Sequence, residues 1–118
     1  MFNLLKKKSE FVFTKENKTL FTSILTDIYT VLRDNAYIHQ ANWIIQILAC
    51  VVKENAAEFK KKVISAELLG GAGSVIDVCM AEKEKMDRLD ELMNSFLNLT
   101  VDSGLNDRLL KSLIIKKR

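Results

Sequence analysis

The segment Gly70-Gly71-Ala72-Gly73-Ser74 has the residue types that can hold an anion. Backbone N–H groups at a glycine turn that opens a helix can bind a phosphate. The segment lacks the Lys-Ser/Thr pair of a phosphate-binding loop, and it follows a predicted helix where a dinucleotide-binding fold requires a strand. We therefore interpret it as a tight corner between two helices, where glycine lets the backbones approach closely.

The same corner has the position of the turn in a helix-turn-helix reader of DNA, with residues 56–69 as the first helix. A recognition helix presents Arg, Lys, Asn or Gln to base edges and phosphates. The residues that follow Ser74 are instead apolar or acidic, with Asp77 and Glu82 among them. Their chemistry argues against a helix that reads DNA.

Side chains suited to nucleophilic or metal chemistry are few and scattered. His39 is the single histidine, and its neighbours one helical turn away, Asn35 and Trp43, are neither metal ligands nor nucleophiles. Cys50 and Cys79 lie in apolar stretches without the spacing of a metal knuckle or redox pair, so we predict small, reduced core residues. We expect no catalytic residue, no metal, no cofactor and no enzymatic activity.

Carboxylates concentrate between residues 77 and 91. Those that we predict to bind a partner are Asp77, Glu82, Glu84, Asp87, Asp90 and Glu91. A cluster on one helix lacks the second helix that a metal site in a bundle requires. The spacings of Lys83 to Asp87 and of Glu84 to Arg88 are also those of ordinary helical ion pairs, worth about 0.2–0.5 kcal/mol each. Two interpretations stay open, a solvated helix face and an acidic surface for docking.

Charge is distributed unevenly along the chain, although its net value is only +3. Residues 1–66 carry ten Lys or Arg against six Asp or Glu, residues 67–107 carry three against nine, and residues 108–118 carry five against none. A field of one sign on one face steers partners of the opposite sign. The basic ends, Lys6 to Lys8 and Lys116 to Arg118, suggest nucleic acid or an anionic membrane as partners, or simply solvated termini.

Apolar periodicity predicts an all-α fold, a single-domain bundle of five to six helices over residues 1–118, with 1–15 and 116–118 open to fraying. The chain has no proline, and three of its four glycines stand at residues 70–73. We predict helices over 18–34, 36–52 and 56–69, a helix from Ser74 that bends near 80–82, one over 82–99, and a last helix from Asn106 or Asp107. Ser74 and Asp77 have the spacing of a capping box. The helix over 36–52 is apolar nearly all round, which predicts that it is central and the most buried.

The N-terminal lysines lack an apolar segment of signal-peptide length behind them, and no apolar run reaches the ~18 residues of a membrane span. The two cysteines form no disulfide framework. We therefore expect a cytoplasmic protein with no membrane partner.

The glycines, Ser74 and Asp77 occur in a fixed order, within the sequence LLGGAGSVID at residues 68–77. This order resembles the Gly-Gly-x-Gly-Ser-x-x-Asp corner of small helical bacterial proteins, some of which resemble immunity proteins of polymorphic toxin and contact-dependent growth inhibition systems. The resemblance implies a cytosolic antitoxin that binds a cognate toxin domain, blocks its active site and performs no catalysis. It assigns no interface residue, because such proteins vary most where they bind.

The charges agree with this implication. Many toxins of this kind are nucleases, whose clefts are basic because they attract phosphate, and an acidic helix face complements them. We expect a basic toxin, for which a nuclease is a fitting example, on the six carboxylates named above. The alternative hypothesis is a small helical regulator or adaptor that binds nucleic acid through the basic termini. We do not favour nucleic acid as the partner.

Overall fold

The computed structural model describes residues 11–70 and 73–117, with side chains up to residue 114. This part of the chain contains no strand and folds into six helices, which confirms the all-α prediction. The helices are α2 (Lys15–Asp34), α3 (Ile38–Val52), α4 (Ala56–Val63), α5 (Ala66–Leu69), α6 (Lys83–Asp102) and α7 (Arg108–Lys117).

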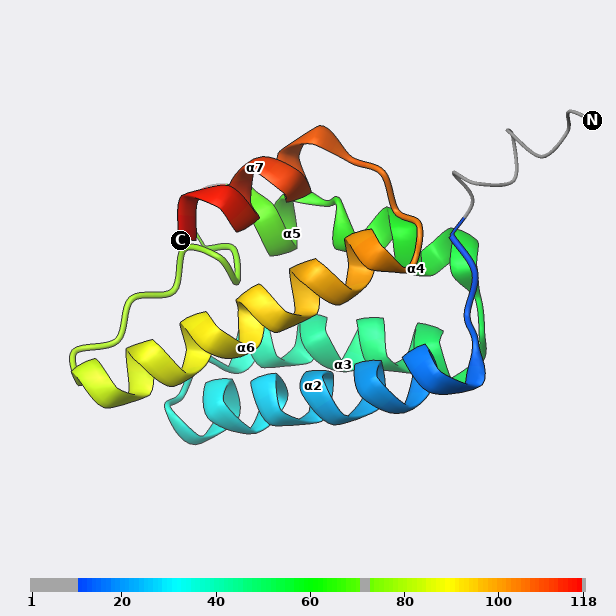
Figure 1. The fold of residues 1–118 in the computed structure, drawn as a ribbon. Coiled ribbons are helices and arrows are strands. Elements are labelled where there is room, and N and C mark those ends of the chain that lie inside the picture. Colours follow the sequence, from blue (N-terminus) through cyan, green and yellow to red (C-terminus); the bar gives the residue numbers. More distant parts are fainter. Residues whose placement is uncertain (1–10, 71–72, 118) are drawn as a thin grey trace, which may run out of the picture.

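Helix α2 packs against both α3 and α6, and Figure 1 shows α6 above the pair formed by α2 and α3. Helices α2 and α3 are antiparallel neighbours, as shown by Lys18 near the start of α2, which pairs at 2.6 Å with Glu54 just after α3. On the other side of α2, α6 runs across the bundle and carries α7, while α4 and α5 pack against α3. Helix α4 also reaches α6, because the rings of Phe59 and Phe96 lie 6.3 Å apart.

A buried asparagine ties the start of α2 to the end of α6. Thr14 and Asn17 form a capping box, in which each side chain accepts a hydrogen bond from the backbone N–H of the other, at 3.0 and 2.8 Å. The Asn17 amide also donates to the Val12 carbonyl at 2.9 Å and to the Ser103 hydroxyl, after α6, at 3.1 Å. Every polar atom of the Asn17 side chain is thus paired, which is the condition for burying it.

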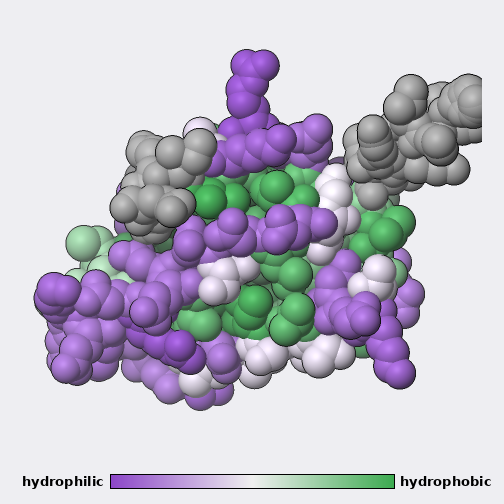
Figure 2. Space-filling view, viewed as in Figure 1, coloured by the Kyte–Doolittle hydropathy of each residue, from purple (hydrophilic) through white to green (hydrophobic). Residues whose placement is uncertain are grey.

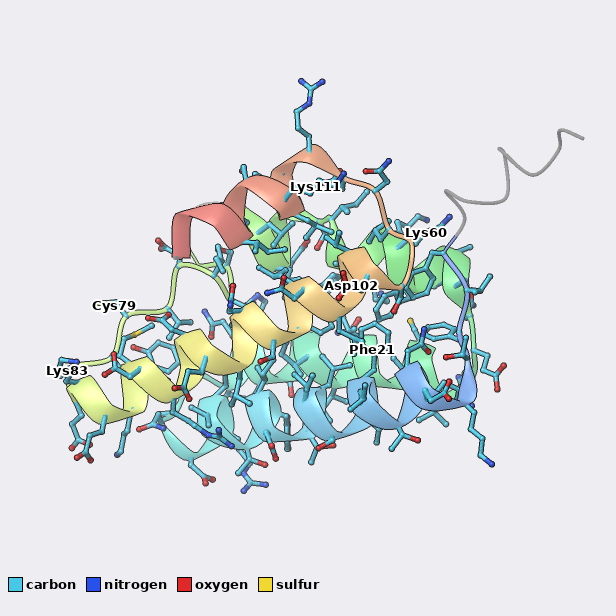
Figure 3. All side chains as sticks on the ribbon, viewed as in Figure 1. Phe21, Lys60, Cys79, Lys83, Asp102 and Lys111 are labelled. Carbon is cyan, nitrogen blue, oxygen red and sulfur yellow. The ribbon has the colours of Figure 1, made fainter. Side chains whose placement is uncertain are left out.

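Phenylalanine rings from several elements form the centre of the core. Phe21 on α2 contacts Phe59 on α4 and Phe96 on α6, with ring centroids 5.1 and 5.8 Å apart, and all three are fully buried. Phe11, in the extended segment before α2, stacks on Phe59 at 5.0 Å. Figure 3 shows Phe21 directed from α2 toward α6. Edge-to-face and stacked rings at these separations stabilise beyond the area that they bury.

The helix predicted from Ser74 does not form, and the next helix begins only at Lys83. The backbone N–H groups of Val75 and Ile76 donate instead to carbonyls of α5, at 3.0 and 2.9 Å. The Ser74 hydroxyl is buried without a hydrogen bond, so the predicted capping box with Asp77 is wrong. Residues 73–77 form turns, and the chain then runs irregularly to α6.

Two further predictions change in detail. The helix predicted over 56–69 divides into α4 and α5, with the hydroxyl of Ser65, between them, donating to the Lys62 carbonyl at 2.6 Å. The helix predicted over 36–52 is not enclosed on all sides, because α3 leaves Ile38, Ile45 and Val52 exposed. Helix α3 nevertheless contacts three other helices, α2, α4 and α5.

Replacing Phe21 by alanine tests the aromatic core. The cavity and the lost ring contacts are expected to lower the free energy of unfolding by about 3–5 kcal/mol. Leu20→Ala is the matched control, because the neighbouring Leu20 is 51% exposed and its loss is expected to cost less than about 1 kcal/mol. Urea denaturation followed by circular dichroism measures both, and equal losses would show that α2 is rotated differently in the bundle.

Candidate functional site

Helix α6 displays three of the predicted carboxylates along one outer line. Its buried residues face α2 and the core, and they are Leu89, Leu92, Met93, Phe96, Leu97 and Thr100. Glu84, Asp87 and Glu91, spaced by three and four residues, lie on the opposite side and are exposed. We call these three residues the acidic stripe.

The other three predicted carboxylates do not belong to this line. Glu82 precedes the helix and pairs with Lys85 at 3.1 Å. Arg88 faces α2, where it meets Asp27 at 3.6 Å. Asp90 follows Arg88 by two residues, which is a rotation of about 200° around the axis of α6. It therefore lies on the side of α6 away from α2. Asp77 is exposed in the turn that follows Ser74, outside the helix.

Basic side chains on α6 partly balance the stripe. Lys83 donates to Asp87 at 2.7 Å, as its spacing predicts, and this hydrogen bond and the charge of Asp87 raise the pKa of Lys83. The pair predicted between Glu84 and Arg88 is replaced by the pair of Arg88 with Asp27. Glu84 and Glu91 have no ion-pair partner among the described residues. They are the carboxylates of the stripe whose charge is least compensated.

An apolar groove borders the stripe between α2 and α6. Along α2, one line of residues at spacings of three and four faces α6, as the Asp27–Arg88 pair shows: Leu20, Ile24, Asp27, Val31 and Asp34. Leu20 is exposed, while Ile24, Val31 and Leu99 of α6 are half-buried. Figure 2 shows hydrophobic side chains gathered between the two helices. We call Leu20, Ile24, Val31 and Leu99 the α2–α6 groove.

One end of this groove is hollowed beside the stripe. A depression of about 400 Å³ is lined there by Thr30, Val31, Asp34, Asn35, Glu84, Lys85 and Arg88. Glu84 thus belongs to both the stripe and the groove wall. The apolar residues of the groove were missed at the sequence level, because Leu20, Ile24 and Val31 repeat with the same period as the core residues beside them.

The glycine corner leads into an irregular segment that α3 holds by hydrogen bonds, and it does not open a helix toward an anion. Gly73 has φ +85°, a left-handed conformation that glycine adopts without strain. The Gln40 amide of α3 donates to the Gly73 carbonyl, and the Tyr37 hydroxyl donates to the Cys79 carbonyl, both at 3.0 Å. Gly71 and Ala72 lie outside the described residues.

The remaining candidates are placed as follows. His39 is exposed on α3. The described residues contain no group of His, Cys, Asp and Glu that could hold a metal ion. No helix in the described part of the chain has the length and hydropathy needed to cross a bilayer. Lys6 to Lys8, the side chains of Lys116 and Lys117, and Arg118 lie outside the described residues, so the structure does not place the basic ends.

Comparisons of the chain with models of known protein families, with curated proteins and with solved structures gave no match. The function is therefore argued from the surface geometry of the chain itself.

The two cysteines differ in a way that chemistry can test. Cys50 is buried, as predicted, and desolvation raises the pKa of its thiol, whereas Cys79 is exposed in the segment before α6, which corrects its predicted place in the core (Figure 3). A thiolate is the reacting form, so at neutral pH we expect one thiol per chain to react rapidly with a thiol reagent and the second only on unfolding. Cys79→Ser should remove the fast phase. Two fast thiols in the native protein would contradict this placement.

Proposed function

We propose that the protein is a cytoplasmic immunity protein that binds a cognate bacterial toxin domain through the acidic stripe and the α2–α6 groove. The observation that carries the proposal is that one surface combines the stripe, on the first half of α6, with the α2–α6 groove, whose exposed Leu20 lies farther along, beyond the Asp27–Arg88 pair. An apolar centre with a charged rim is the usual anatomy of a protein–protein interface.

The stripe and the groove contribute to binding in different ways, because the stripe is charged and exposed to water whereas the groove is apolar. Exposed charges in water contribute little net affinity, and here Lys83, Lys85 and Arg88 offset part of the negative field. Their main effect is to speed and orient the encounter with a basic surface. Burial of Leu20, Ile24 and Leu99 by an apolar side chain of the partner supplies most of the affinity.

This surface selects a basic partner that also presents an apolar side chain. A nuclease toxin fits, because its substrate cleft must attract phosphate and is therefore positively charged. Occupation of such a cleft by α6 would exclude the substrate, so neutralisation needs only tight binding and no catalysis by this chain. The resemblance at residues 68–77 points to the same class of protein.

Charge reversal of the stripe tests the proposal. If the neighbouring upstream gene encodes a large secreted protein with a variable C-terminal domain, that domain is the partner to use. The triple variant E84K/D87K/E91K is expected to weaken binding at least about 100-fold, because like charges then face each other across the interface. It should also abolish protection of cells that express the domain. Binding is measured by calorimetry, and circular dichroism confirms the fold.

The matched control reverses three carboxylates on the α3–α5 side, E54K/E58K/E67K, so that the net charge changes equally. It should bind and protect like the original protein. Full protection by the folded stripe variant, or equal losses in both variants, would reject the proposed interface.

The groove is tested separately with Leu20→Ala. We expect this variant to keep its stability and to lose about tenfold or more in affinity for the toxin domain, because truncation of a central apolar anchor removes its buried contact. Ile45→Ala, which truncates an apolar residue of α3 that is 40% exposed, is the control. An affinity unchanged by Leu20→Ala would place the apolar part of the interface elsewhere.

A further inference from the structure

Helix α3 carries a second exposed apolar line, on a side of the molecule that the proposed toxin interface does not use. Ile38, Ile45 and Val52 are 52, 40 and 64% exposed and follow one another at intervals of seven residues. Asn42 and Ala49, also exposed, lie between them. The 15 residues of α3 include no Asp, Glu, Lys or Arg, although charged residues make up 28% of the chain.

The adjoining side of α2 is uncharged as well. Lys18 reaches across to Glu54 after α3, so this side of α2 faces α3, and Thr22 and Thr26 continue it at helical spacing. Both threonines are exposed. Asp27, the one charged residue of α2 between Lys18 and Arg33, is turned toward Arg88 of α6. We call the exposed residues of this surface the α2–α3 face: Thr22, Thr26, Ile38, Asn42, Ile45, Ala49 and Val52.

We propose that the α2–α3 face binds a second copy of this chain, with the two α3 helices antiparallel across a two-fold axis at Ile45. Ile38 and Val52 are each seven residues from Ile45, so the axis places Ile45 against Ile45 and each Ile38 against Val52 of the second copy. A two-fold interface must be complementary to itself, and an apolar line centred on one residue meets this requirement.

The charges around the face agree with a copy of the same chain as its occupant. A surface that carried net charge would repel its own copy, whereas the middle of this face is neutral. Its two ends carry ion pairs, Lys18 with Glu54 and Arg33 with Asp34 at 2.9 Å, and an antiparallel arrangement brings one end over the other. Each end presents both signs of charge, so like-charge repulsion between the ends of the two copies does not prevent the contact.

The size of the face sets the strength of the dimer. At 1.5 Å per residue, α3 is about 22 Å long, and two helices packed 8–10 Å apart present a surface about 20 Å wide. The face therefore buries roughly 450 Å² per copy, below the ~800 Å² of a standard stable interface. We infer a weak, concentration-dependent dimer. Because α6 packs on the opposite side of α2, dimerisation leaves the acidic stripe accessible in both copies.

Sedimentation of the purified full chain, from about 10 µM to about 1 mM, tests the dimer in the range where weak complexes form. The weight-average mass should rise from that of a 13.5 kDa monomer toward twice that value. Ile45→Asp should weaken the dimer by at least about tenfold, because the axis places two carboxylates against each other. Leu20→Asp, on the α6 side of α2, should leave it unchanged. A monomer at every concentration, or equal losses in both variants, would overturn the proposal.

Cysteine cross-linking tests the antiparallel register in a Cys79→Ser background. Ile45→Cys should form a disulfide-linked dimer under mild oxidation, because each copy presents this position to itself. Ile38→Cys alone should link poorly, whereas mixing Ile38→Cys with Val52→Cys chains should give the linked heterodimer. Efficient linking of Ile38→Cys to itself would contradict the register. Linking of Ile45→Cys no faster than of Leu20→Cys would reject the dimer, whether or not the toxin interface on α6 is correct.

Discussion

The contact of Phe21 with Phe59 and Phe96 is the interaction on which the other features depend. It joins α2, α4 and α6 in one cluster, in which Phe59 and Phe96 also contact each other and all three rings are fully buried. By burying Phe21, it fixes the rotation of α2 about its own axis. Leu20, Ile24 and Val31 are thereby turned to the α6 side, and Lys18, Thr22 and Thr26 to the α3 side. The α2–α6 groove and the α2–α3 face both follow from that one rotation.

The two surfaces differ in the chemistry that they offer. Next to α6, apolar side chains are bordered by carboxylates whose charge is only partly compensated by ion pairs, and such a surface suits a cationic protein. Next to α3, apolar side chains are bordered by threonine, asparagine and alanine, which suits a neutral and symmetric contact. The segment 73–82 links these regions physically, because Gln40 and Tyr37 at the start of α3 hold the chain that leads into α6. The helix that carries the acidic stripe is therefore preceded by a segment that α3 holds, while α6 itself packs against α2 and α7.

Much of the helical pattern could be predicted from the sequence, since α2 and α6 begin within three residues of their predicted starts. Periodicity could not separate Leu20 from Phe21, because core and edge residues of a helix repeat with the same spacing. The predicted helix at Ser74 failed because the N–H groups of Val75 and Ile76 bond to α5, a contact that local spacing does not reveal. Of the six predicted carboxylates, helical geometry aligns Glu84, Asp87 and Glu91. Asp90 lies one helical step, about 100°, from Glu91, a difference that composition alone does not resolve.

The central claim is that partners are bound by α6 together with the adjoining side of α2. Hydrogen–deuterium exchange, compared with and without the proposed toxin partner, tests it most directly because it reports each segment separately. The account predicts slower exchange on binding in the first turns of α6 and in residues 20–31 of α2, with α4 and α5 unchanged. Slower exchange confined to α4, α5 or the chain termini would contradict it.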